Sequence, residues 1–202
     1  AAIIASGPST KKADPSLLRG CRVIALKQCV DLYPEADAVY GCDKPWWEFR
    51  RGLPEFRGLK VTWRGNGLAG FEDIRRIDIA EMPKPSAEKY ASDIRMEPVG
   101  TIGGGGNSGF QAMNLALQWG ARQIVLIGFD MSDRGGVHWY GRNHWPAANN
   151  PSDSNFKRWI AAFNGSVPVL DRIGARVINA SPNSALACYP KMSLEKALAE
   201  FA

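Results

Sequence analysis

Short apolar runs, each ending in polar or glycine-rich residues, recur along the whole chain. They lack the strict alternation of a half-buried strand, which is typical of strands buried on both faces of a parallel sheet. The clearest is the run QIVLIGFD at residues 123–130. The other predicted strands cover residues 2–5, 22–27, 38–43, 59–63 and 176–180.

Helix signals lie between these runs. Residues 107–119 begin at Asn107, a residue type that caps helices well, and their apolar positions repeat with helical spacing. Further helices are expected over residues 152–170 and 193–201, with a single turn near 15–18.

Alternating strands and helices predict an α/β fold. We expect a single Rossmann-like, doubly wound domain over residues 1–202, with a mostly parallel sheet and helices on both faces. Residues 65–100 are poor in pattern, with scattered charges, glycines and prolines. This segment is expected to be a mostly irregular excursion over the site.

Composition narrows the class of protein. The 202 residues are 45% hydrophobic and 22% charged, which suits one globular domain with a core of its own. No apolar run approaches the roughly 18 residues that a membrane span needs. The four cysteines form no C-x-x-C pair, so we expect reduced thiols in a cytoplasmic protein. The net charge of +5 favours anionic partners such as a nucleotide, phosphate or nucleic acid.

The first predicted strand leads into Ser6, Gly7, Pro8 and Ser9. Ligands of open parallel sheets bind beyond the carboxyl ends of the strands. Small residues there let the backbone approach a ligand, and serine hydroxyls can bind phosphate or ribose. A plain turn is the alternative for this segment.

Residues 103–109 (GGGGNSG) combine a glycine run with the expected start of a helix. They contain G-x-G-x-x-G from Gly104 to Gly109, and Asp130 lies farther on at the distance of the acidic residue of dinucleotide-binding domains. The motif lies in mid-chain after a weak strand, however, and no Gly-Lys-Ser/Thr follows. This argues against a nicotinamide cofactor and against a P-loop, while a helix amino end still favours an anion.

Both histidines of the chain, His138 and His144, lie in the long polar loop after the strand 123–130. Catalytic residues of α/β proteins are often carried by loops in this position, and histidine accepts a proton near neutral pH. Tyr140 and Arg142 lie between them and can hold a phosphate. A surface loop with incidental histidines, or a metal site, is the alternative.

Two further segments carry candidate chemistry. Residues 179–184 follow the last predicted strand, and Asn183 and Ser184 can line the same crevice, or form a turn that closes the sheet. Residues 44–51 (KPWWEFRR) mix aromatic and basic side chains, which can stack on bases and neutralise phosphates. The alternative for 44–51 is a helix that buries its two tryptophans in the core.

The order of these motifs resembles that of the bacterial family-42 sialyltransferases and their wider sialyltransferase-like relatives, many of them phage proteins. The matching elements run over nearly the whole chain, apart from residues 65–100. They are S-G-P-S after the first strand, D-K-P after the third, N-S-G at a helix start, L-x-x-G-A at its end, I-V-L-I-G-F-D, a histidine-containing loop, and S-P-N-S after the last strand.

The resemblance implies a Rossmann-like domain that binds a nucleotide sugar without a metal, with a loop histidine as base. The matching nucleotide-contacting positions are Gly7, Pro8, Ser9, Asp43, Asn107, Ser108 and Gly109. His138 matches the family's first loop histidine and His144 its catalytic one. The chain departs from the family where Met131 and Ser132 replace a tyrosine, and where the glycine run replaces an arginine.

Together with the resemblance, these observations predict a nucleotide-dependent transferase and, within that class, a metal-independent glycosyltransferase. His144, assisted by His138, would deprotonate the acceptor hydroxyl. Arg142, Tyr140 and the helix starting near Asn107 would stabilise the leaving phosphate. No cofactor and no Mg²⁺ are expected, and the acceptor is a glycan or a modified base of phage DNA.

Two other classes stay open. A non-catalytic nucleotide-binding or virion-associated protein would keep only the fold. A nucleotide pyrophosphotransferase would need Mg²⁺, for which the loop offers only Asp130 and Asp133. The sequence leaves the oligomeric state, the nucleobase and the sugar open.

Overall fold

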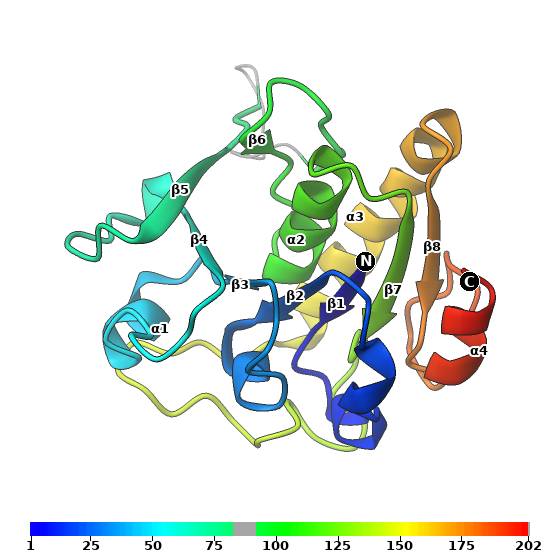
Figure 1. Ribbon diagram of the computed structural model, residues 1–202, viewed down its shortest axis with the longest axis horizontal. Helices are drawn as coiled ribbons and strands as arrows, with labels where there is room; N and C mark the ends of the chain where they lie inside the picture. The colour runs from blue at the N-terminus through cyan, green and yellow to red at the C-terminus, as the bar shows by residue number, and fades with distance from the viewer. Residues whose placement is uncertain (83–91, 202) are drawn as a thin grey trace.

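A computed structural model describes residues 1–82 and 92–201. Its eight described strands form one sheet, in which all pairings are parallel and the order is β6-β5-β4-β3-β2-β1-β7-β8 (Figure 1). The predicted α/β fold with a parallel sheet is therefore confirmed. The strands are β1 Ala2–Ile4, β2 Val23–Leu26, β3 Ala38–Tyr40, β4 Leu59–Trp63, β5 Ile74–Ile79, β6 Thr101–Ile102, β7 Gln123–Ile127 and β8 Arg176–Asn179.

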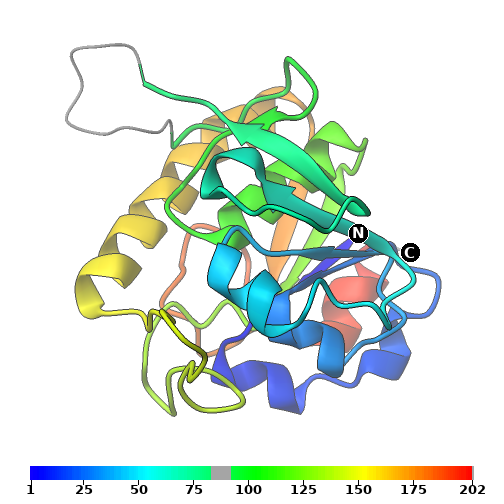
Figure 2. The same ribbon diagram turned by 90° about the vertical axis from the view of Figure 1, so that its left-hand side faces the viewer.

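Helices cover both faces of the sheet, as expected. Those described are α1 Lys44–Phe49, α2 Ser108–Gln118, α3 Asp153–Arg172 and α4 Leu194–Ala199, with 3-10 turns η1 Pro8–Lys12, η2 Pro15–Leu18, η3 Lys27–Asp31 and η4 Arg64–Asn66. Figure 2 shows green α2 and yellow-to-orange α3 on one side of the sheet, and the blue 3-10 turns and red α4 on the other.

Each face has its own hydrophobic core because successive strand residues point to opposite sides. Ile3 packs under α2 and α3, among Phe110 and Phe163, whereas Ala2 and Ile4 pack on the face of α1 and α4. A strand buried on both faces needs apolar residues at consecutive positions, which explains the continuous runs seen in the sequence.

The described part of residues 65–100 is mostly irregular, as expected, but it also holds a strand that was not predicted. Ile74–Ile79 forms β5, the longest of the described strands, and Ile74, Ile77 and Ile79 are buried. Arg75 and Asp78 are exposed on opposite faces of this near-edge strand, so charged residues interrupt its isoleucines and no continuous apolar run appears in the sequence. The rest of the expected excursion includes residues 83–91, which lie outside the described residues.

The aromatic-basic segment forms α1, and its two tryptophans settle the choice between the two interpretations. Trp46 and Trp47 are fully buried, so they belong to the core and cannot stack on an external base. Phe49, at the end of the helix, stays exposed. The four cysteines are free thiols, with Cys29 buried and the others half-buried. No helix in the described part of the chain is long and apolar enough to cross a membrane.

Candidate functional site

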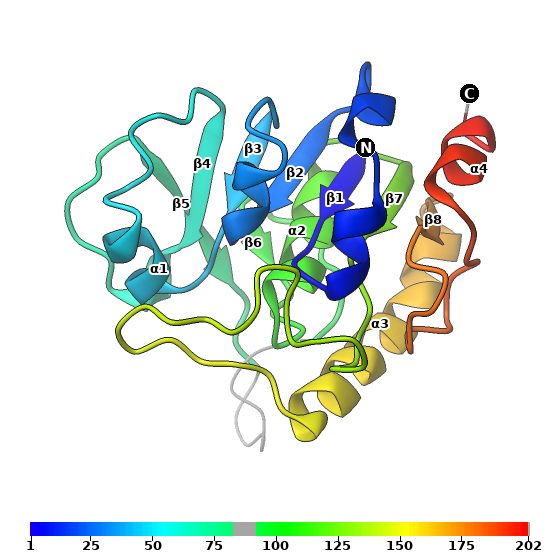
Figure 3. The same cartoon turned by 90° about the horizontal axis from the view of Figure 1, so that it is seen from below.

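A cavity of about 290 Å³ lies at the carboxyl ends of the central strands. In the sheet, β1 lies between β2 and β7. The chain therefore leaves β1 towards β2 at one edge of β1, and after α2 it enters β7 at the other edge. The loops after β1 and β7 therefore diverge, and such a switch point is where open α/β sheets bind ligands. Figure 3 shows the loop after β7 crossing this end of the sheet. The cavity is lined by residues 5–7, 26–27, 42–43, 106–109, 128–132, 137–138, 143, 149–151, 155–156 and 158–159.

Glycines allow the walls of the cavity to approach each other. A Cβ at Gly7 would lie 2.0 Å from Asp130 Oδ2, and one at Gly109 would lie 2.6 Å from the ring of Phe129. Gly128 has a φ of +75°, which few other residues adopt. Two of the three, Gly7 and Gly109, were predicted as ligand contacts from their loops. Both line the cavity, and both are also required by packing.

Hydrogen bonds between Ser9 and Asp130 join the loop after β1 to the loop after β7. Asp130 Oδ2 accepts a hydrogen bond from Ser9 Oγ at 2.8 Å and from the Ser9 backbone N–H at 3.3 Å. Ser6, Gly7 and Asp130 line the cavity, as predicted for a nucleotide site, but Pro8 and Ser9 lie outside its lining. Pro8 is the first residue of η1, and both the hydroxyl and the backbone N–H of Ser9 are hydrogen-bonded to Asp130.

The loop after β8 supports the site from behind. Ser184 Oγ donates to the carbonyl of Phe129 and accepts from the Leu186 backbone N–H at 2.9 Å, and Ser181 Oγ accepts from the Phe129 N–H at 3.0 Å. Ser184 is buried and Asn183 is exposed, and neither lines the cavity. The prediction that Asn183 and Ser184 line the crevice is therefore corrected: this turn fixes Phe129 instead.

The amino end of α2 opens into the cavity. Asn107 caps the helix through its Oδ1, which accepts from the Phe110 N–H at 2.8 Å. Asn107, Ser108 and Gly109 all line the cavity, as predicted. The first N–H groups of a helix have no partner inside it, so this end offers donors and a positive dipole to an anion. Ser108 Oγ lies 3.3 Å from Cys42 Sγ.

Lys27 and Asp43 form an ion pair on the wall made by the ends of β2 and β3, with Nζ 2.6 Å from Oδ2. Burial opposes the charge of both groups, but their mutual attraction outweighs it, which raises the pKa of Lys27 and lowers that of Asp43. Lys27 has a φ of +49°, an uncommon conformation for a residue with a side chain. Asp43 was predicted from the sequence; Lys27 was not, although it ends an apolar strand.

His138 faces the cavity. Its Nδ1 lies 2.9 Å from Ser6 Oγ, and its Nε2 is buried with no partner among the described residues. Burial, together with the positive charges of Lys27 and Arg142, lowers the pKa of His138 from the usual 6.5 to about 4. The imidazole is therefore neutral at physiological pH.

The other three predicted catalytic residues do not line this cavity. Tyr140 stacks on the far side of His138, with ring centroids 5.1 Å apart, and donates its hydroxyl to Asn143 Oδ1 at 2.7 Å. Burial raises the pKa of Tyr140. His144 lines a second, more open groove and contacts Phe49. Arg142 is exposed and lines neither.

The predicted convergence of these four residues on one site is therefore corrected. Trp145 is buried and stacks on Phe49, which anchors this part of the loop to α1. His144, next to this anchor, is held on the α1 side. The backbone N–H of Trp139 donates to the Ser6 carbonyl at 2.9 Å, and this bond holds the neighbouring His138 at the cavity.

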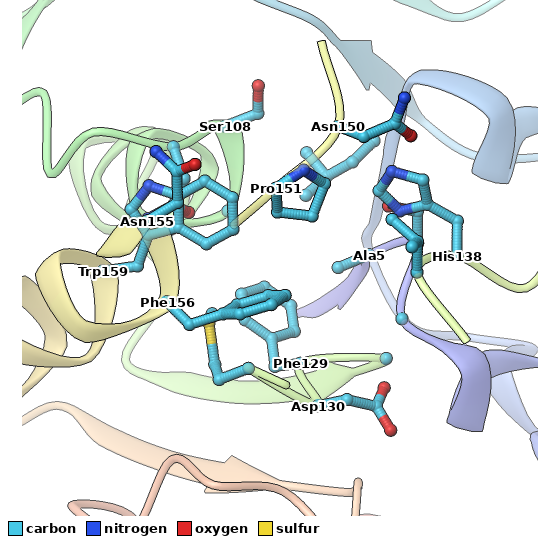
Figure 4. A pocket seen from close by; sticks show the side chains of 18 of the residues that line it. Ala5, Ser108, Phe129, Asp130, His138, Asn150, Pro151, Asn155, Phe156 and Trp159 are labelled. Carbon is cyan, nitrogen blue, oxygen red and sulfur yellow. The ribbon is translucent and has the colours of Figure 1, made fainter. Parts of the chain in front are cut away.

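An aromatic wall, which sequence reasoning missed, closes the opposite side. Figure 4 shows Phe129, Phe156 and Trp159 gathered across the cavity from His138 and Asn150. Phe156 and Trp159 meet edge to face at a centroid distance of 5.5 Å. The signal for this wall was present in the aromatic residues in the first turns of the predicted helix 152–170. The cavity thus offers aromatic surface on one side, and His138 and Asn150 on the other.

Comparison with known proteins adds no assignment: no family model, curated protein or solved structure matches the chain. Among the described residues no group of three or more His, Cys, Asp and Glu side chains could hold a metal ion. The described side chains of the cavity offer a neutral histidine, a lysine–aspartate pair, a helix amino end and an aromatic wall.

Proposed function

We propose that the protein is a nucleotide-dependent transferase whose cavity binds a nucleotide sugar and whose base is His138. The observation that carries the proposal is the placement of His138. Its free Nε2 lies in a two-sided cavity at the switch point of a parallel sheet. A base can pack against the aromatic wall, while the phosphates lie towards the amino end of α2 and Lys27.

His138 is suited to accept a proton. When Nδ1 donates to Ser6 Oγ, the lone pair of Nε2 is free to act as a base. The acceptor hydroxyl would give its proton to Nε2 as its oxygen bonds to the anomeric carbon. As this bond forms, the bond from the anomeric carbon to the phosphate oxygen breaks, and the nucleotide leaves with the electron pair. The negative phosphate would oppose the field of Lys27 and bring the pKa of His138 towards neutrality.

One observation favours a second candidate, a nucleotide-binding protein without transferase activity. Tyr140 and Arg142, the expected partners of the leaving phosphate, lie outside the cavity lining. Such a protein would bind nucleotides with the same cavity but would neither hydrolyse nor transfer a sugar.

Thermal unfolding with a panel of nucleoside mono- and diphosphates and their sugar conjugates tests the binding step. A ligand at roughly 100 times its Kd adds about 2.7 kcal/mol to stability, which gives a clear rise in Tm. The panel also includes NAD and Mg²⁺. If no member shifts the Tm, the proposal falls.

Donor hydrolysis and transfer by His138→Gln then test the base. Loss of turnover with nucleotide binding retained is expected, and His144→Gln is the matched control because it changes the only other histidine, which lies outside the cavity. Full turnover in His138→Gln would exclude its role as base. Nucleotide binding by the unmodified protein without turnover would favour the second candidate.

A further inference from the structure

The cavity receives the amino ends of two helices. Gly106 to Gly109 bring the start of α2 to it, and Asn155 and Phe156 bring the first turn of α3. α3 has 20 residues and α2 has 11, so both are long enough to carry an end dipole. Two positive helix ends at one cavity are costly unless an anion or solvent offsets them.

Side chains of α3 lie directly beside the loop that starts α2. A Cβ placed on Gly106 would lie 3.0 Å from Arg158 Nε and 3.3 Å from Trp159 Cδ1. Cδ1 is bonded to the indole nitrogen of Trp159, so the guanidinium and the N–H edge of the indole flank the same glycine. Gly105 and Gly106 have φ values of +54° and +72°, in the left-handed region that glycine adopts most readily.

Both side chains have unused hydrogen-bonding capacity. Trp159 Nε1 is buried and has no partner among the described residues, and burying such a donor unpaired is unfavourable. Arg158 is exposed at the rim of the cavity and forms no ion pair with a described carboxylate, so its guanidinium is open to a ligand from solvent. An indole N–H can only donate, and a guanidinium donates in a fixed plane. A phosphate oxygen accepts from both kinds of donor and brings the negative charge that the guanidinium and the two helix ends favour.

We propose that Gly106, Arg158 and Trp159, with the two helix ends, form a binding site for a tetrahedral phosphate dianion. The site rests on the proposed function in one respect: in the transferase it would receive the phosphate of the leaving nucleotide. It assigns phosphate recognition to α3 as well as α2, and makes Trp159 a hydrogen-bond donor rather than only an aromatic surface. Binding of phosphate alone, without a nucleoside, follows from this arrangement.

Calorimetric titration with inorganic phosphate tests the site. Trp159→Phe removes the N–H and keeps an aromatic ring, and Arg158→Ala removes the guanidinium; each should weaken phosphate binding about tenfold, as expected for loss of one charge-assisted or buried hydrogen bond. Matched controls are Trp119→Phe, at an exposed tryptophan on the far end of α2, and Lys157→Ala, at the exposed cation next to Arg158. Both should bind phosphate like the unmodified protein.

The outcomes separate this inference from the proposed function. No phosphate binding, or binding that Trp159→Phe and Arg158→Ala leave unchanged, overturns the site even where nucleotides still bind. Equal losses in the controls also overturn it, because they would show a general charge or stability effect. Phosphate binding that depends on residues 158 and 159 in a protein that binds no nucleotide supports the site and refutes the nucleotide-dependent transferase.

Discussion

Lowering the pH should destabilise the protein through His138. In the folded state burial and nearby positive charges hold its pKa at about 4, while in the unfolded chain it returns to the usual 6.5. Between these pH values His138 is protonated in the unfolded chain but neutral in the folded protein. The free energy of unfolding therefore falls as the pH falls from about 6.5 towards 4. Above pH 6.5 the imidazole is neutral in both states, so His138 causes no loss of stability there.

The size of the effect follows from the pKa difference. At about 1.4 kcal/mol per pKa unit the shift corresponds to about 3 kcal/mol. The ring is only half-buried at the cavity, and solvent screening reduces this, so we expect about 1–2 kcal/mol. Urea unfolding of the unmodified protein, His138→Gln and His144→Gln, from about pH 7.5 to about pH 4.5, measures it. Carboxylates that titrate in this range contribute equally to all three proteins and cancel in the comparison.

The His138→Gln variant should lose this part of the pH dependence, and His144→Gln should keep it. A constant offset between variants, from the lost Ser6 contact for example, does not affect the comparison because only the slope is read. Equal slopes in the unmodified protein and His138→Gln between about pH 6.5 and 4.5 would refute the reasoning.

Three other predictions concern stability and are checked by urea unfolding at neutral pH. Gly7→Ala should cost about 1–3 kcal/mol, because its Cβ would meet Asp130 Oδ2 at 2.0 Å; unchanged stability would show that the two loops can separate. Gly165→Ala should stabilise by up to about 1 kcal/mol, since this exposed position in α3 has open space around it; a loss would contradict that. Asn107→Ala should cost about 1 kcal/mol through the lost cap of α2, and a neutral result would mean that water replaces the cap.

The strands and most helices could be predicted from the sequence because their signals are local. A strand buried on both faces, such as β7, must be apolar throughout, and Asn107 and Ser152 each precede a helix that they cap. β5 could not be identified in this way, because charged residues on both faces of this near-edge strand interrupt its isoleucines. Its pairing with β4 joins residues distant in the sequence, which a local pattern does not reveal.

Which of the two histidines lies at the cavity could not be predicted from the local sequence either, because long-range contacts decide it. Both lie in one loop without regular structure, and their directions depend on contacts with segments distant in the sequence. The Ser6 carbonyl holds the backbone next to His138, and Phe49 stacks on the residue after His144. The serines after β8 were expected at the ligand because polar groups at a strand end have the same sequence signal whether they face a ligand or a backbone carbonyl.

Phe129 links the stability of the fold to the shape of the site. Its ring lies against Gly109 at the start of α2 and meets Phe163 of α3 at 5.8 Å. Its backbone is held by Ser181 and Ser184. One residue, two positions after the end of β7, thus contacts both the start of α2 and the middle of α3. A change that displaces this ring would disturb the start of α2 and its packing against α3, so it should weaken anion binding and lower stability together, whereas a change at the exposed Arg158 should affect binding alone.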